Sequence, residues 1–226
     1  MRLAIGVVLM VAGCAAPGPT AFDAPFARAS FTAERIARIA EREWYAFGSA
    51  EVADSERVTA GGRIETDDGW WQRVGDYWHQ GVGSPSTGLH EAADGRPFWS
   101  AAFISYVVRA AGAGPRFFYS DVHADYINRA IDQPGALVGY PIDQQVPQRG
   151  DILCQARADA VGRVTFARRP QRYPAHCDIV IAASDHAVWV IGGNVADTVA
   201  RRRFRLVEGR VDPAGAPWLA LLRFQR

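Results

Sequence analysis

The stretch from Pro97 to Gly112 constrains the fold of this chain more than any other part of the sequence. It is an almost uninterrupted apolar run that begins with a proline and ends with a glycine. Proline is favoured at the first position of a helix, where its missing N–H is not needed, and glycine is favoured just past the last turn. The apolar residues recur at spacings of three and four: Phe103, Ile104, Val107, Val108 and Ala111. This periodicity predicts a helix that is covered on most of its sides.

Ser100 falls in the first turn of this predicted helix. The free backbone N–H groups and the positive end of the helix dipole favour developing negative charge at that point. Ser100 is therefore a candidate nucleophile. A small polar residue that satisfies a helix start is the plainer interpretation, and the local sequence alone favours it.

The composition excludes several classes of function. The length of 226 residues favours one domain. The 25 basic side chains balance the 24 acidic ones, which argues against nucleic acid or a polybasic membrane surface as partners. Every one of these basic residues is arginine, so a Schiff-base lysine, a Ser-Lys dyad and a P-loop lysine are all excluded. The five histidines show no metal-ligand spacing, and we expect neither a metal nor another cofactor.

The N-terminus has the pattern of a targeting segment. Arg2 precedes an apolar run from Leu3 to Val11, and small residues lead up to Cys14. The run is too short to span a bilayer as a mature helix. Its ending resembles the lipobox of bacterial lipoproteins, which implies that residues 1–13 are a signal peptide and that Cys14 is lipidated. A plain secretory signal with a chance cysteine is the alternative.

The same resemblance implies a location. Ala15 rather than aspartate follows the lipidated cysteine, which implies retention at the outer membrane of a Gram-negative cell, on the periplasmic side. Residues 14–29, rich in alanine and proline, are expected to be a flexible tether. In that oxidising compartment Cys154 and Cys177 form an even pair, so we expect a disulfide between them; two free buried thiols are the alternative.

The hydrophobic pattern predicts helices first and strands second. Helical spacing covers residues 32–47, 70–79, 97–111 and 120–131. The polar segment 51–68 is expected to be a loop. Strand-like segments follow Pro134 and cover residues 151–156, 161–167, 176–182, 187–191, 198–207 and 218–224. Residues 30–226 are therefore expected to form a single α+β domain, with N-terminal helices packed on a C-terminal antiparallel β-sheet.

Three polar residues are spaced along the chain like a nucleophile, a base and an orienting group. Ser100 is at a helix start, His176 is at a strand start, and Asn194 follows two glycines at the end of the next strand. In such a site the helix start supplies N–H donors for an oxyanion, the imidazole moves the proton, and the amide fixes its tautomer. Trp99 and His123 are possible cleft-lining residues, although packing is the default role for both.

Three segments of the sequence resemble those of a known group of enzymes. The segment from Ser100 to Gly112 is similar in register to the Cys-Ser-Gly helix of NlpC-type and CHAP cell-wall hydrolases, and Arg149 to Leu153 and Ala175 to Ile181 resemble their first strand and their histidine strand. The chain resembles more closely an uncharacterised domain family of proteobacterial lipoproteins, over about residues 30–210. The resemblance implies a papain-like fold and places Asn194 as the third polar residue.

The chain departs from the hydrolases at the nucleophile, where they carry cysteine and this chain carries Ser100. A thiol beside histidine can exist as thiolate, whereas a hydroxyl must lose its proton during attack. Cys177 is not expected to replace the thiol, because neighbouring residues of a strand point to opposite faces and His176 is its neighbour.

Two functions follow from the resemblance. The first is an envelope-anchored hydrolase that cuts amide or peptide bonds of peptidoglycan with Ser100, His176 and Asn194; transfer to another acyl acceptor uses the same residues. The second is a catalytically inactive papain-like module that binds cell-wall peptide or a protein partner. In both, the lipid anchor makes the membrane contact.

Two arginine-rich segments are compatible with an anionic polymer or lipid. One contains Arg168, Arg169 and Arg172, and the other runs from Arg201 to Arg205. A solvated strand face that resists edge pairing is the plainer interpretation.

Overall fold

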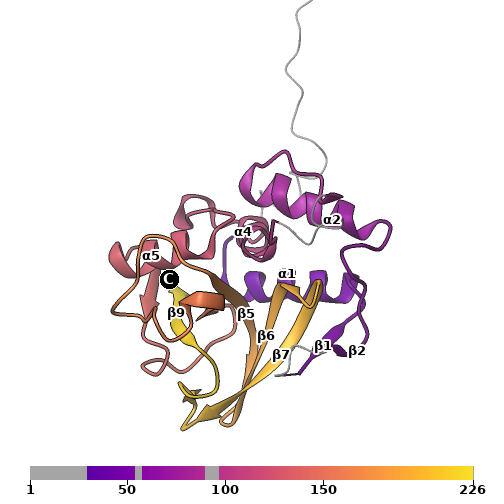
Figure 1. The fold of residues 1–226 in the computed structure, drawn as a ribbon. Coiled ribbons are helices and arrows are strands. Elements are labelled where there is room, and N and C mark those ends of the chain that lie inside the picture. Colours follow the sequence, from indigo (N-terminus) through magenta and orange to yellow (C-terminus); the bar gives the residue numbers. More distant parts are fainter. Residues whose placement is uncertain (1–29, 54–57, 90–96, 226) are drawn as a thin grey trace, which may run out of the picture.

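A computed structural model describes residues 30–53, 58–89 and 97–225 of the chain. Figure 1 shows helices gathered on one side of a curved sheet. The elements are, in chain order, α1 (Ala33–Ala46), β1 (Ala50–Val52), β2 (Val58–Ala60), α2 (Trp70–Asp76), the π-helical turn η1 (Tyr77–Val82), α4 (Ser100–Ala110), the 3-10 turn η2 (Gly114–Arg116), α5 (His123–Asp132), β3 (Leu137–Tyr140), β4 (Ile152–Ala156), the 3-10 turn η3 (Ala158–Ala160), β5 (Ala175–Ala183), β6 (Ala187–Val195), β7 (Thr198–Val207), β8 (Arg210–Val211) and β9 (Trp218–Phe224).

The expected signal peptide (residues 1–13), Cys14 and the tether (14–29) lie outside the described residues. Within the part that is described, no helix is long and apolar enough to span a bilayer.

The α+β class is confirmed, but the sheet is mixed rather than antiparallel. Its strand order is β2-β1-β7-β6-β5-β4-β9-β3, and β8 pairs with β7. Strands β1 and β7 pair in parallel. The segment expected to be a loop supplies β1 and β2 to the edge of the sheet, where they pair antiparallel with each other. Glu51 on β1 lies opposite Arg201 on β7, and their side chains form an ion pair at 2.6 Å. Residues 161–167, expected to be a strand, lie outside the strands in the connection between β4 and β5.

The helix starts show which local signals decided the boundaries. Thr32 caps α1 as predicted, since its hydroxyl accepts a hydrogen bond from the Arg35 N–H at 3.1 Å. Helix α2 begins after Gly69 rather than after an aspartate cap. Helix α4 begins at Ser100, three residues later than Pro97, so that Ser100 is its first residue. Ser100 therefore lies at the N-terminal end of α4.

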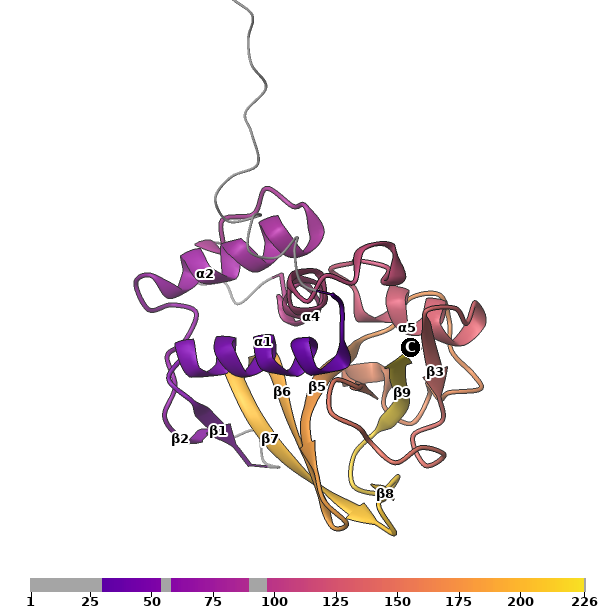
Figure 2. The same ribbon diagram turned by 180° about the vertical axis from the view of Figure 1, so that it is seen from behind.

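Helices α1 and α4 cover one face of the sheet, and α2 packs on the outer side of α4 (Figures 1 and 2). Strand alternation assigns the faces. Cys177 and Ile179 of β5 belong to the core beneath the helices, whereas Val180 belongs to a second cluster on the other face. Because the side-chain period of a strand is two residues, His176 and Asp178 share the face of Val180. Cys177 therefore points away from His176, as expected.

The expected disulfide is present in the structure. Cys154 of β4 lies directly opposite Cys177 of β5 and is bonded to it. The bond consumes the thiol of Cys177.

A buried carboxylate holds the helices to one another. Glu43 of α1 is fully buried, and it accepts hydrogen bonds from Arg73 at 2.7 Å, from Arg42 at 2.9 Å and from the Tyr77 hydroxyl at 2.9 Å. Arg73 also donates to the Tyr106 hydroxyl of α4 at 3.0 Å. Burial and the neighbouring Glu43 carboxylate raise the pKa of Tyr77 well above its ordinary value, so this phenol stays protonated and remains a donor. One anion thus joins α1, α2, η1 and α4.

We expect Glu43→Gln to lower the free energy of unfolding by about 3 kcal/mol, because it removes the fully buried carboxylate that Arg73 and Tyr77 contact and leaves the partly exposed Arg73 with the ion pair to Asp76. The matched control is Glu51→Gln, which removes an ion pair with Arg201 in which both side chains are about one-third exposed. That change should cost less than about 1 kcal/mol. Urea denaturation of both variants measures the difference, and equal losses would contradict the role given to Glu43.

Candidate functional site

The starts of two helices meet at Ser100 and His123. Ser100 is the first residue of α4, and His123 is the first residue of α5. The Ser100 Oγ lies 2.6 Å from the His123 Nε2, and both residues are nearly buried. The contact joins a hydroxyl to an imidazole in hydrogen-bonding geometry, which is the basic unit of a serine nucleophile and its base.

Tyr126 orients the imidazole of His123. Its hydroxyl, one turn further along α5, hydrogen-bonds the His123 Nδ1. Burial and the negative charge of Asp178 raise the pKa of Tyr126 well above its ordinary value, so the phenol keeps its proton. In the tautomer with the proton on Nδ1, that N–H donates to the Tyr126 oxygen and Nε2 accepts from the Ser100 hydroxyl. This is the arrangement that a general base requires.

The His123 imidazole is neutral at pH 7. Burial, together with the nearby His176, lowers its pKa well below 6.5, although the Asp178 carboxylate acts in the opposite direction. When His123 accepts a proton, the negative charge of Asp178 therefore stabilises the imidazolium that forms.

His176 lies directly behind His123, with 5.5 Å between the two ring centroids. It is fully buried, and its Nε2 lies 3.0 Å from the Asp178 Oδ1. Burial lowers the pKa of His176, with partial compensation by Asp178. Burial alone would raise the pKa of Asp178, but Arg202, which hydrogen-bonds its other oxygen, and His176 hold it well below its ordinary value. The Nδ1 of His176 has no hydrogen-bond partner among the described residues.

A cavity of about 640 Å³ opens beside Ser100. Gln155 of β4 lies directly opposite His176 of β5 and also lines it. Arg157 supplies positive charge to its wall, where Arg202 is paired with Asp178, and none of the described lining residues is aspartate or glutamate. Its apolar lining includes Phe98, Val161, Pro174, Phe204 and Pro217. The nucleophile candidate therefore faces a space large enough for a small ligand, with a cationic and partly apolar wall.

Two adjacent glycines allow the elements of the site to approach closely. A Cβ on Gly192 would lie 2.0 Å from the Asp178 Oδ1 and 3.0 Å from the His176 Nε2. A Cβ on Gly193 would lie 2.6 Å from atoms of the Phe103 side chain on α4. A side chain at the first position would displace the His176–Asp178 pair, and one at the second would push α4 off the sheet. The glycines preceding Asn194 thus have a packing role.

The start of α4 places backbone N–H groups without an acceptor inside the helix next to the nucleophile candidate. The first hydrogen bond within α4 runs from the Phe103 N–H to the Trp99 carbonyl at 2.9 Å. The N–H groups of Ser100 and Ala101 precede it and have no acceptor within the helix. They are donors suited to a developing oxyanion.

The site differs from the expected combination of Ser100, His176 and Asn194. Ser100 is hydrogen-bonded to His123 rather than to His176, and the partner of His176 is Asp178 rather than Asn194. Asn194 lies in a β-bulge of β6 with φ of 55°, and the structure gives it no hydrogen bond to His176. The bulge after Gly192 shifts the register of β6 against β7 at this position.

Trp99 does not line a cleft. It is fully buried, and its indole N–H donates to Glu65. The large ring belongs to the aromatic core between α1 and α4.

The sequence did contain signals for the residues that were missed. Asp178 is two residues after His176, so strand alternation alone places both on one face. Tyr126 is three residues after His123, a spacing that brings side chains together on a helix. The contact between Ser100 and His123 joins two helix starts, and no spacing rule predicts it.

Among the described residues, no group of three or more His, Cys, Asp or Glu side chains is placed so that it could hold a metal ion.

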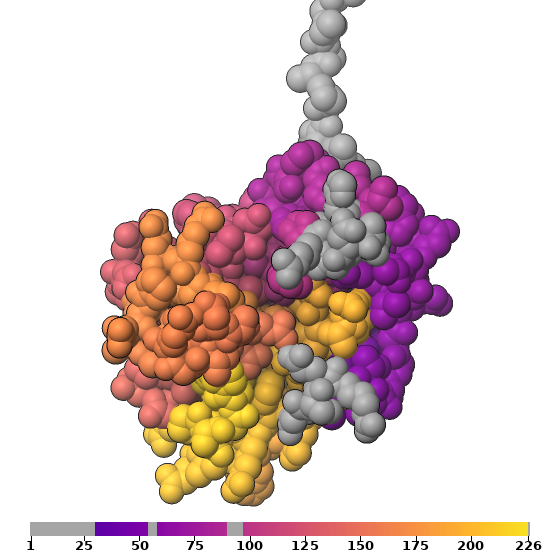
Figure 3. Space-filling view, viewed as in Figure 1, coloured from indigo at the N-terminus to yellow at the C-terminus, as the bar shows by residue number. Residues whose placement is uncertain are grey.

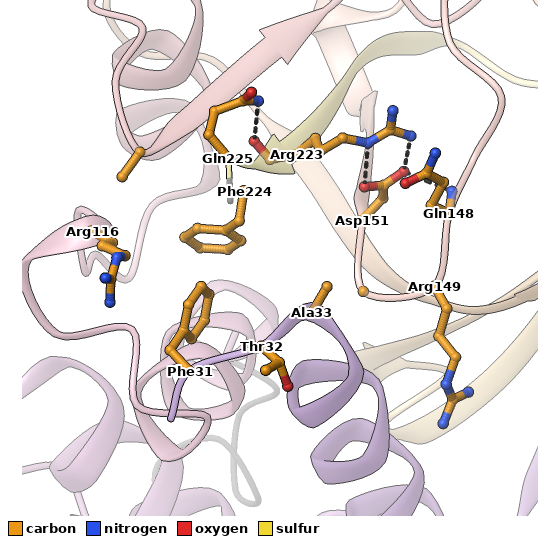
Figure 4. Close-up of a pocket in the computed structure, with 12 residues that line it drawn as sticks. Phe31, Thr32, Ala33, Arg116, Gln148, Arg149, Asp151, Arg223, Phe224 and Gln225 are labelled. Carbon is orange, nitrogen blue, oxygen red and sulfur yellow. Dashed lines mark hydrogen bonds and ion pairs between the residues drawn. The ribbon is translucent and has the colours of Figure 1, made fainter. Parts of the chain in front are cut away.

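A second cavity, of about 1060 Å³, lies between the start of α1 and the end of β9 (Figure 4). Phe31 and Phe224 meet edge to face within it, with ring centroids 4.8 Å apart. Its carboxylate Asp151 is already bound by Arg223, at 2.9 and 2.6 Å. Because its lining contains no hydroxyl–imidazole pair, we place the candidate site at Ser100 instead.

Stability should fall as the pH drops below about 6.5, where the unfolded histidines gain protons that buried His123 and His176 do not. Because the unfolded chain then binds more protons, the free energy of unfolding should decrease by up to about 1.4 kcal/mol per pH unit for each histidine. Urea denaturation between pH 7 and 5 measures this slope, and His123→Gln should reduce it. An unchanged slope in that variant would contradict a depressed pKa for His123.

The chain belongs to a bacterial family, described as uncharacterized protein conserved in bacteria (DUF2272), which matches residues 65–223. The match includes Ser100, His123, His176 and Asp178. No curated protein and no solved structure matches the chain.

Proposed function

We propose that this member of the bacterial family is a serine-dependent hydrolase that cuts amide or peptide bonds of peptidoglycan. The observation that carries the proposal is the 2.6 Å contact between the Ser100 Oγ and the Nε2 of a neutral, buried His123, at a helix start that borders a cavity. The peptidoglycan substrate is supported by the resemblance of the Ser100, Arg149 and His176 segments to NlpC-type and CHAP cell-wall hydrolases of papain-like fold. A lipid anchor at Cys14 would hold the enzyme at the outer membrane, facing the periplasm.

Each step uses a group already described. Ser100 attacks the carbonyl carbon while His123 takes its proton, and the N–H groups at the start of α4 stabilise the oxyanion. His123 then gives the proton to the leaving amine, and water releases the acyl group by the reverse sequence. Asp178, held by Arg202, stabilises the transient imidazolium of His123 through space, and His176 is a positioning residue between them.

A second candidate is a module that binds cell-wall peptide or a protein partner without cleaving it. The observation in its favour is the low pKa of His123, because a weak base removes the proton of a hydroxyl less readily than that of a thiol. The NlpC-type and CHAP hydrolases that the chain resembles carry cysteine at the position of Ser100. Gain of cleavage in Ser100→Cys, with an inactive parent, would support this candidate.

We expect Ser100→Ala to abolish the release of soluble fragments from purified peptidoglycan, and His123→Asn to slow it by about 10²–10⁴-fold. Ser105→Ala is the matched control, since it removes another buried hydroxyl of α4, one that donates to the Ser120 carbonyl at 2.8 Å. It should cleave at close to the parent rate. Undiminished release by Ser100→Ala would overturn the assignment.

The pH profile gives a further sign of the base. Because burial lowers the pKa of His123, cleavage should stay constant from pH 8 to below 6.5 and decline only at more acidic pH. A decline that begins above pH 7 would contradict His123 as the base.

A further inference from the structure

Positive charge is concentrated in the connection between β4 and β5. Residues 157–174, which we call the arginine loop, contain five arginines and a single aspartate, whereas the whole chain carries a formal net charge of +1. The loop forms the orange surface on the left of the molecule in Figure 3. A local excess of this size attracts anions even though the protein as a whole is nearly neutral.

Helix α5 holds the arginine loop in place. The Asn128 amide donates to the Pro170 and Gln171 carbonyls, both at 3.1 Å, and the Tyr173 hydroxyl donates to the Asn128 Oδ1 at 3.1 Å. Arg169 pairs with Asp132 at the end of the same helix. The loop therefore presents its other arginines from a fixed backbone, which reduces the entropy lost when a ligand binds.

Two arginines of the loop form no ion pair with any residue that the structure describes. Arg163 pairs with Asp159, whereas Arg168 and Arg172 are exposed and have no ion pair among the described residues. Arg163, Arg168 and Arg172 all line a hollow of about 440 Å³. Its one acidic lining residue is Asp159, which Arg163 already neutralises.

The hollow adjoins the Ser100 cavity. Pro174 lines both, and the first residue of the loop, Arg157, lines the Ser100 cavity. A guanidinium has five N–H donors, so Arg157 can bind a ligand in addition to any protein group that it contacts. Its charge also reaches the imidazoles of His123 and His176, since it contributes to the lowered pKa of both. Arginines of one loop thus lie in the walls of both neighbouring hollows.

We propose that the arginine loop binds a polymer that carries carboxylates at intervals, so that one carboxylate meets Arg157 near Ser100 and another meets Arg168 and Arg172. The inference rests on the proposed function of Ser100 and names the charge of its substrate. Guanidinium groups bind carboxylates in a bidentate geometry, which suits repeated recognition along a chain. A hollow lined by arginines accepts a chain that enters it, whereas a flat anionic bilayer would touch only the protruding side chains.

The test measures binding and cleavage separately. Sedimentation with purified peptidoglycan should show roughly tenfold weaker binding for the double variant Arg168→Gln/Arg172→Gln than for the parent, since each exposed charge pair contributes up to about a factor of five. The matched control is Arg205→Gln/Arg210→Gln, which removes two exposed arginines from β7 and β8 and should bind like the parent. Peptidoglycan whose carboxylates have been amidated should bind the parent about as weakly as unmodified material binds the double variant.

Binding equal to the parent in the double variant, or undiminished on amidated peptidoglycan, would overturn the inference. So would a loss confined to vesicles that contain phosphatidylglycerol, which would assign the loop to a membrane. Ser100→Ala should bind normally, because it keeps the arginine loop. Normal charge-dependent binding without any cleavage by the parent would support the loop and refute the hydrolase, whereas cleavage with charge-independent binding would do the reverse.

Discussion

The buried pair of Asp178 and Arg202 is the interaction on which the site depends. A carboxylate with no access to water is tolerated only when its charge is neutralised and its oxygens are hydrogen-bonded, and here Arg202 takes one oxygen and His176 takes the other. The pair fixes β5 against β7, and Gly192 of the intervening β6 leaves the room for it. His176 is thereby immobilised behind His123. The charged groups lie on the sheet, one layer away from the Ser100 hydroxyl.

Helix α5 joins two parts of the molecule that the chain separates. Its first residue contacts Ser100, and its second half holds the arginine loop through Asn128 and Asp132. The nucleophile candidate and the cationic surface therefore share one rigid support. A ligand that bound across both would meet groups whose spacing is set by a single helix rather than by two independent loops.

Local patterns predicted most of the fold, and of the Ser100–His123 pair they predicted the place of Ser100 at a helix start but not its partner. The periodicity of α1 and the alternation in β5 are strong enough that tertiary contacts did not override them, and the even number of remaining cysteines predicted the bond between Cys154 and Cys177. The short strand β1 lacks such a pattern, since a three-residue strand at a sheet edge is defined by its pairing with β7 rather than by its own residues. The sequence makes His123 a possible cleft-lining residue, with packing as its default role. Its contact with Ser100 depends on how α4 and α5 approach each other, and that is a property of the packed domain.

The disulfide lies one residue away from the pair formed by Gln155 and His176, in the same two strands. In a sheet, a slip of one residue turns every side chain to the opposite face. Such a slip between β4 and β5 would place a mismatched residue opposite His176 and turn Gln155 away from the cavity. The covalent bond forbids it, because the two sulfur atoms meet only in the observed register. The disulfide can therefore form only in the strand register in which Gln155 lies opposite His176 and lines the cavity. A chain that pairs β4 and β5 in another register cannot form this bond.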